Sequence, residues 1–193
     1  MVTPGFDHFV SIPWCLPLLQ HPRLSLLHDE EPIDDDTRNL FFTKLLLSEG
    51  AISAFLMFYY ETDEKLNPQD LTPVPEIFML VDAKKNVSGW PGVSHGGYIS
   101  TLFDVIGGWH AQCNINRSIE QGHLPKGNRM MTVSLQVTYA KPVLVDRVVL
   151  LKSWVEKVDG RKMHIQMTLE DESRVLLCRG GLVALITSRQ AHL

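Results

Sequence analysis

A single carboxylate stands among small residues in the segment from 95 to 113. The segment begins His95-Gly96-Gly97, reaches Asp104 after six more residues and continues through Gly107-Gly108. A carboxylate can serve as a general base or as a nucleophile. Backbone N–H groups of a glycine pair can approach a substrate carbonyl and stabilise an oxyanion. The segment therefore predicts acyl-transfer chemistry, although the Gly-Gly pair alone is equally typical of a plain turn.

A long helix from residue 95 to about 116 would position these groups. Its apolar side would pack on a sheet, and its other side would carry small residues around Asp104. The apolar side comprises Ile99, Leu102, Phe103, Ile106 and Cys113, and the small side comprises Gly97, Ser100, Thr101, Asp104, Gly107, Gly108 and Ala111. Ser94 is the expected N-cap. Glycine inside a helix costs about 1 kcal/mol relative to alanine, so Gly107-Gly108 predicts close approach of a backbone or ligand.

The spacing of Gly96 and Asp104 constrains how they could cooperate. They are eight residues apart, which on a helix is about 12 Å. One reacting carbon cannot contact both groups over that distance. Two such helices running antiparallel across a two-fold axis would bring Gly96 of one chain beside Asp104 of the other. The mechanism thus predicts an isologous dimer.

The rest of the chain predicts an α+β fold, an antiparallel sheet with the long helix on one face. We expect an irregular arm over 1–33, a helix over 37–48, and loops over 62–75 and 84–93. Asp159-Gly160 predicts a tight hairpin. Alternation along 131–139 places Met131 and Tyr139 on a buried face and Thr132 on the polar face. The expected strands are 51–61, 76–83, 131–139, 143–158, 161–169 and 174–187. The segment 51–61 could also continue the preceding helix, and we favour a strand. We divide the chain into an arm and helix (1–50) and a main domain (51–193).

Composition excludes several classes of function. The formal charge is −4 with no Lys/Arg-rich run, so nucleic acid is not an expected partner. Three scattered cysteines and dispersed histidines predict no metal site and a reducing compartment, hence the cytoplasm. No apolar run is long enough to span a membrane. The C-terminal Ala191-His192-Leu193 is similar to a Ser-Lys-Leu peroxisomal address, or matches it by chance.

His95-Gly96-Gly97 followed by six residues and Asp104 resembles the motif of hotdog-fold acyl-CoA thioesterases. The nearest groups are the phenylacetate-pathway (PaaI-type) enzymes and the mammalian thioesterase-superfamily members. Residues 131–142 and 157–162 are similar to their following strand and hairpin, and the likeness extends from about 76 to 187. The arm around Ile12-Pro13-Trp14-Cys15 resembles fungal members. The resemblance implies a hotdog fold assembled as homodimers or dimers of dimers.

The same resemblance implies roles for individual residues. Asp104 would be base or nucleophile, the Gly96 amide an oxyanion donor, and Thr132 the hydroxyl that positions water. We assign contacts with the acyl-CoA substrate to His95, Gly97, Ser100, Arg161 and Lys162, although solvated turn charges would also explain the last two. CoA is part of the substrate, and no separate cofactor is expected. Many relatives carry Asn or Gln where this chain has Gly89, so a second polarising side chain must come from elsewhere, such as Asn86.

A dry, apolar surrounding would strengthen Asp104 as a base. Ile99, Phe103, Trp109 and the segment 55–60 are expected to supply it. The residues 1–33 are a candidate cover for the acyl tunnel.

Two other functions compete with hydrolysis at Asp104. Gly92-Val93-Ser94-His95-Gly96 fits the Gly-x-Ser-x-Gly elbow of serine hydrolases. That elbow needs an apolar strand before it and βαβ units after it, whereas Lys84–Pro91 is polar and hairpins follow. The second alternative is a protein that binds or processes acyl-CoA or a polyketide intermediate in a biosynthetic pathway without hydrolysing it.

Overall fold

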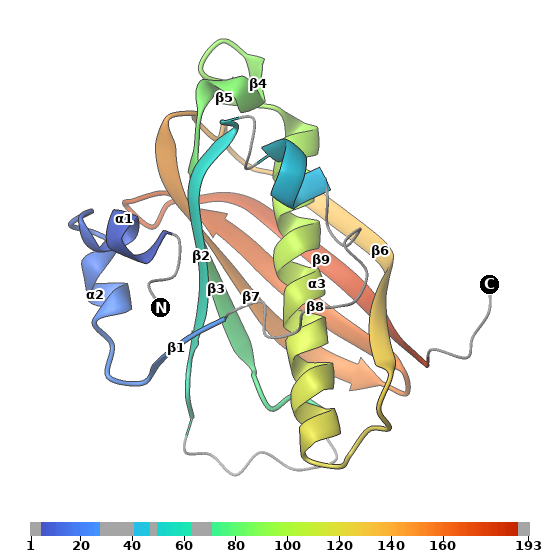
Figure 1. Cartoon of the computed structure of the whole chain (residues 1–193). Coiled ribbons are helices and arrows are strands. Elements are labelled where there is room, and N and C mark those ends of the chain that lie inside the picture. The colour runs from blue at the N-terminus through green and yellow to red at the C-terminus, as the bar shows by residue number, and fades with distance from the viewer. Residues whose placement is uncertain (1–4, 28–40, 47–49, 63–70, 189–193) are drawn as a thin grey trace.

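One long helix, α3, crosses one face of an antiparallel sheet in the computed structural model, as expected (Figure 1). The structure describes residues 5–27, 41–46, 50–62 and 71–188. The helical elements are α1 (Phe6–Val10), α2 (Leu16–Leu19), the π-helical turn η1 (Phe41–Leu46), the 3₁₀ turn η3 (Lys85–Val87) and α3 (Gly96–Glu120). The strands are β1 (Leu24–Leu26), β2 (Ile52–Tyr60), β3 (Glu76–Ala83), β4 (Ser88–Trp90), β5 (Val93–Ser94), β6 (Asn128–Tyr139), β7 (Arg147–Asp159), β8 (Lys162–Glu170) and β9 (Leu176–Ser188).

Seven strands form the main sheet in the order β1-β2-β3-β7-β8-β9-β6. Every neighbouring pair is antiparallel. β7 and β8 are joined by a turn at Gly160 and Arg161, and Gly160 has the positive φ of 56° that such tight hairpins favour. In this strand order β6, the strand that follows α3, lies at one edge of the sheet.

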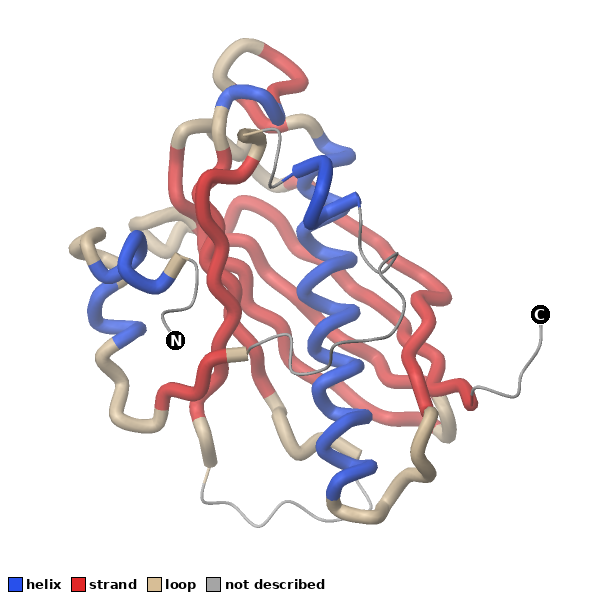
Figure 2. Tube along the Cα trace, viewed as in Figure 1, coloured by secondary structure: helices blue, strands red, loops and turns tan. Residues whose placement is uncertain are grey.

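The sheet separates two apolar clusters. The larger one lies between α3 and the inner face of the sheet, and includes Leu102, Phe103 and Ile106. The smaller one lies on the outer face of β2, β3 and β7, where α1 and α2 cover it with Phe9 and Leu19. Figure 2 shows α1 and α2 on the side of β2 away from α3. β3 is apolar almost throughout because both of its faces are covered.

The arm and the loop before α3 differ from the prediction. Residues 5–27 are not irregular, since they form α1, α2 and β1, and they lie on the outer face of the sheet, away from Asp104. Residues 84–94 contain η3 and the two-stranded β4–β5 sheet instead of a plain loop. Of the predicted helix 37–48, only 41–46 lies within the described residues, and it is helical. Residues 189–193, with the C-terminal tripeptide, lie outside them.

The predicted strands 51–61 and 76–83 are present as β2 and β3, and the four later strands are present with shifted ends. Among the described residues, no helix is both long enough and apolar enough to cross a bilayer.

Candidate active site

Helix α3 is capped by His95, and the prediction of Ser94 as the N-cap was wrong. His95 has extended backbone angles, and its Nδ1 accepts a hydrogen bond from the Gly97 N–H at 3.0 Å. Nδ1 must be unprotonated to accept, so the proton of the neutral ring lies on Nε2. Ser94 is buried in β5, where its N–H bonds to the Val143 carbonyl at 2.8 Å. A serine nucleophile needs a hydrogen-bonded base beside it. Within the described chain, the Ser94 hydroxyl has no such partner.

Side chains also hold the carbonyls of the Gly-Gly turn. The Tyr139 hydroxyl donates to the Gly96 carbonyl at 2.9 Å. The Ser100 hydroxyl lies 2.8 Å from the Tyr139 oxygen and donates to it, because the Tyr139 proton is already engaged. Thr101 donates from Oγ1 to the Gly97 carbonyl at 3.0 Å. The Gly96 N–H, first in the helix, has no preceding helical carbonyl to bond. It is the amide to which a substrate carbonyl can bond.

Asp104 and Thr132 are brought together from different elements. Thr132 Oγ1 on β6 donates to Asp104 Oδ1 on α3 at 3.0 Å, and both residues are exposed. This bond uses one lone pair of one carboxylate oxygen. Asp104 Oδ2 is left to accept a proton or to attack a carbonyl carbon.

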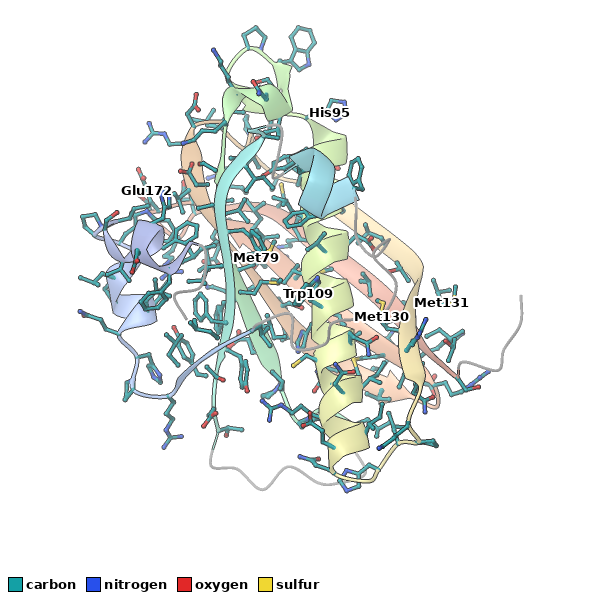
Figure 3. The ribbon with its side chains drawn as sticks, in the orientation of Figure 1. Met79, His95, Trp109, Met130, Met131 and Glu172 are labelled. Atoms are coloured by element: carbon teal, nitrogen blue, oxygen red, sulfur yellow. The ribbon has the colours of Figure 1, made fainter. Side chains whose placement is uncertain are left out.

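A β-bulge in β6 produces this pairing. The register of β6 with β9 shifts between Thr132 and Ser134, so Val133 is the extra residue. Thr132 lies opposite the buried Ala184 and faces α3. The prediction that Thr132 lies on the polar face and Met131 on the buried face was therefore wrong. Figure 3 shows Met130 between α3 and β6 and Met131 on the outer side of β6.

The division of α3 into two faces was partly wrong as well. Ile99, Leu102, Phe103 and Ile106 face the sheet as expected. Gly107 and Ala111 are buried too, although they were expected on the small-residue side. A Cβ at Gly107 would lie 2.9 Å from Leu182 Cδ1 of β9, so close contact with the sheet explains this glycine. Gly108, by contrast, lies on the side near Met130 of β6.

Asp104 does not lie in a dry apolar surrounding within one chain. Ile99 and Phe103, which were expected to supply that surrounding, are buried against the sheet on the opposite side of α3. β2 contributes its apolar side chains to the two clusters that flank the sheet. Any exclusion of water from Asp104 must therefore come from a group outside the described residues of this chain.

The position of Gly89 explains why no side chain is found there. A Cβ at Gly89 would lie 3.0 Å from the His95 Cα and 3.2 Å from its ring carbon Cδ2. The His95 side chain thus occupies the space that a larger residue 89 would need. Asn86, the other candidate donor, is exposed in η3.

Arg161 and Lys162, the other predicted substrate contacts, lie far along the sheet from the start of α3. Arg161 accepts a hydrogen bond at its carbonyl from Ile186 of β9, level with Met130 at the start of β6. Tyr139, beside Gly96, lies at the opposite end of β6. Arg161 and Lys162 are therefore not grouped with His95, Gly96, Gly97 and Ser100 within one chain.

An open hollow of about 380 Å³ lies beside the start of α3. Its walls come from the helix start and from the chain that follows β6, and they include Gly96, Ile99, Tyr139, Lys141 and Val143. The hollow is the space through which a ligand could reach the Gly96 N–H.

A buried polar cluster anchors the middle of α3 but does not reach the surface. His110 Nε2 donates to the Val74 carbonyl at 2.8 Å, and Ser153 donates to His110 Nδ1 at 2.7 Å. Asn114 pairs with both the N–H and the carbonyl of Val74. Burial lowers the pKa of His110 to about 4. The cluster holds α3, β7 and the chain before β3 in a fixed arrangement, and no sequence motif pointed to it.

Comparisons with known proteins agree with this architecture. A sequence model of the thioesterase superfamily matches residues 91–178. The acyl-coenzyme A thioesterase THEM4 of Rattus norvegicus is 27% identical over 124 residues, or 64% of this chain and 44% of the relative. THEM4 of Xenopus laevis is 27% identical over 144 residues, or 74% of this chain and 54% of the relative. The chain spans about half the length of these relatives.

Solved structures share the fold. Thioesterase superfamily member 2 of Mus musculus aligns with a TM-score of 0.53 and 14% identity, covering 76% of this chain and 88% of that protein. Thioesterase HI1161 of Haemophilus influenzae aligns with a TM-score of 0.52 and 17% identity, covering 61% of this chain and 76% of that protein. The expected hotdog fold is confirmed.

Proposed function

A model of the thioesterase superfamily matches residues 91–178, and on this basis we propose that the chain hydrolyses an acyl-CoA thioester. The observation that carries the proposal is the 3.0 Å hydrogen bond between Thr132 and Asp104. It joins a carboxylate and a hydroxyl from separate elements on an exposed face, where neither is needed to fill the core. The curated relatives named above are acyl-coenzyme A thioesterases, which supports the same chemistry.

We further propose that each site is built from two chains. α3 is one continuous helix from Gly96 to Glu120, so Gly96 and Asp104 are about 12 Å apart along it. A thioester carbon cannot contact both within one chain. In a dimer with antiparallel α3 helices, the Gly96 amide of one chain would face Asp104 of its partner.

The exposed edge of the sheet supports such a dimer. β6 is the last strand of the sheet, and its outer edge is unpaired within the described chain. Met131 is 46% exposed and Val133 is 57% exposed on this strand. An unpaired, apolar edge strand is a surface for pairing with another chain. A two-fold axis at this edge would bring two β6 strands and two α3 helices together. The partner would then exclude water from Asp104.

The chemistry follows from these contacts. The Gly96 N–H would bond to the thioester oxygen and stabilise negative charge as it develops there. Asp104 Oδ2 would take a proton from water while the water oxygen attacks the carbonyl carbon. The C–S bond would then break, and the CoA sulfur would leave with a proton returned from Asp104. Thr132 would hold Oδ1 and fix the direction of Oδ2.

In the alternative route, Asp104 attacks the carbonyl itself and forms an anhydride that water opens. Mass spectrometry of rapidly quenched enzyme distinguishes the routes. The anhydride route requires the mass of an acyl group on the peptide that contains Asp104, and the water route requires its absence.

The test is thiol release from short, medium, long and aromatic acyl-CoAs by wild type and by Asp104→Asn. We expect Asp104→Asn to lose about 100-fold or more in kcat, the usual contribution of general base catalysis. Asp159→Asn, an exposed strand-end carboxylate, is the matched control and should keep full activity. If Ser94→Ala abolished turnover and Asp104→Asn did not, the assignment would be wrong.

Gly89 favours a second candidate, a protein that binds acyl-CoA without hydrolysing it. Gly89 itself supplies no polarising side chain, and a larger residue at this position would crowd His95. Loss of one oxyanion donor costs about 100- to 1000-fold in other enzymes. Measurable acyl-CoA binding with no thiol release from any member of the panel would establish the binding protein instead.

A further inference from the structure

The first turn of α3 is intrinsically weak. It begins with two successive glycines, and each costs about 1 kcal/mol relative to alanine in a helix. Glycine also permits backbone angles that other residues cannot adopt, so the direction of the Gly96 N–H is poorly fixed by local sterics. A site that depends on this amide needs the turn to be held by other contacts.

Three side chains hold this turn, and only one of them comes from outside the helix and its cap. His95 accepts from the Gly97 N–H, and Thr101 donates to the Gly97 carbonyl. The Tyr139 hydroxyl reaches from the end of β6 to the Gly96 carbonyl at 2.9 Å. Ser100 completes a short relay by donating to the Tyr139 oxygen at 2.8 Å.

We infer that Tyr139 is a positioning residue for the Gly96 amide. By holding the Gly96 carbonyl, its hydroxyl fixes the peptide on one side of the Gly96 Cα, and the bond from the Ile99 N–H to the His95 carbonyl at 3.1 Å fixes the other. The Gly96 N–H belongs to the His95–Gly96 peptide. Holding the peptides on both sides of the Gly96 Cα fixes the Gly96 backbone angles, and with them the direction of this N–H beside the hollow that Gly96 lines. The inference rests on the proposed function, because it gives Tyr139 a role in the same thioester hydrolysis.

The β6 bulge is what makes Tyr139 available for this contact. Thr132 and Tyr139 are seven residues apart, so in a regular strand they would point to opposite faces. The extra residue Val133 reverses the alternation, and both side chains face α3. One strand thereby holds both parts of the proposed site, with Thr132 at the carboxylate and Tyr139 at the amide.

Tyr139→Phe is the direct test because it removes one hydroxyl and keeps the ring that lines the hollow. Tyr60→Phe is a matched control, since the Tyr60 hydroxyl also donates to a backbone carbonyl, that of Leu18, at 3.0 Å in the arm. We expect Tyr139→Phe to lower kcat about three- to tenfold, as expected for one neutral hydrogen bond. KM should not change, because the amide acts mainly on the transition state. Tyr60→Phe should leave both constants unchanged.

A second measurement does not depend on activity. In protein labelled with ¹⁵N-glycine, amide exchange of Gly97, whose N–H bonds to His95 Nδ1, should accelerate in Tyr139→Phe and not in Tyr60→Phe. Unchanged exchange would overturn the positioning role, and so would faster exchange with unchanged kcat. If wild type hydrolyses no thioester, the proposed function fails, whereas the exchange experiment still decides whether Tyr139 fixes the turn.

Discussion

The contact between Gly180 of β9 and Phe103 of α3 decides how closely the helix can approach the sheet. A Cβ at Gly180 would overlap the Phe103 ring and would lie 2.7 Å from its Cε1 atom. Phe103 is fully buried and immediately precedes Asp104. Gly180→Ala should therefore displace the helix at the turn that carries the carboxylate.

The expected cost follows from two opposing effects. Replacing glycine by alanine restricts the unfolded chain and stabilises a protein by about 0.4–1 kcal/mol when the site is compatible. Forcing an extra methyl into a packed core costs about 1–3 kcal/mol. The rigid ring of Phe103 is the contacting group, so the cost should be near the upper end of that range. The net loss of unfolding free energy should be about 2 kcal/mol.

Urea unfolding followed by tryptophan fluorescence measures this loss, with Gly181→Ala as the control. A Cβ at Gly181 would meet only Gln166 on the outer face, at an ordinary 3.6 Å. Gly181→Ala should therefore be neutral or slightly stabilising. The explanation fails if Gly180→Ala is as stable as wild type, or if both variants lose the same free energy.

Three further predictions concern stability and assembly. Burial lowers the pKa of His110 to about 4, so between its unfolded value near 6.5 and pH 4 the unfolded chain binds a proton that the folded chain does not. The contribution of neutral His110 to the free energy of unfolding should be complete above pH 6.5 and should fall by about 3 kcal/mol as the pH drops to 4. His110→Gln should reduce this dependence of unfolding free energy on pH, measured by urea titrations at several pH values. An equal pH dependence in both proteins would contradict the assignment. Phe9→Ala, in the arm cluster, should cost about 3–5 kcal/mol of unfolding free energy in the same assay, and a loss below about 1 kcal/mol would show that the arm is not packed as described. Val133→Lys on β6 should give monomers by analytical ultracentrifugation and abolish turnover. Leu144→Lys, at a residue that is 49% exposed and lies outside β6, should remain dimeric. A stable Val133→Lys dimer would exclude the β6 interface.

Regular patterns in the sequence predicted the regular parts of the fold. β3 was predicted from the apolar run 76–83, and its bounds agree because an element buried on both faces has few polar residues to blur its ends. The long helix followed from its apolar spacing, although its end lies at Glu120, beyond the predicted 116. The tight β7–β8 turn followed from Asp159-Gly160.

The errors arise where a single residue changes the geometry. The bulge at Val133 reverses the alternation of β6, and no residue type marks its position. The sequence therefore placed Thr132 on the polar face and gave Tyr139 no chemical role. His95 caps α3 in place of Ser94, because an imidazole that accepts through Nδ1 can replace a hydroxyl. Capping preferences favour serine and did not anticipate this substitution.

The long-range contacts were the least predictable. The prolines and short apolar runs of the arm do not reveal that residues 5–27 fold onto β2 and β3. Gly107 was expected to allow close approach of a backbone or a ligand, whereas it lies against the Leu182 side chain of β9. Helical periodicity defines a stripe on α3 but not the width of the sheet that covers it.

Complementation between two inactive variants tests most directly whether the site is shared by two chains. Asp104→Asn removes the carboxylate. Gly96→Pro removes the amide hydrogen at the first helical position, where proline is best tolerated, and His95 already has the extended backbone that precedes proline. In mixed dimers, one site combines an intact Gly96 with an intact partner Asp104. Equal amounts of the two variants, mixed with subunit exchange, should recover about a quarter of wild-type thioesterase activity by random pairing. Mixed dimers that form but recover no activity would contradict the shared site.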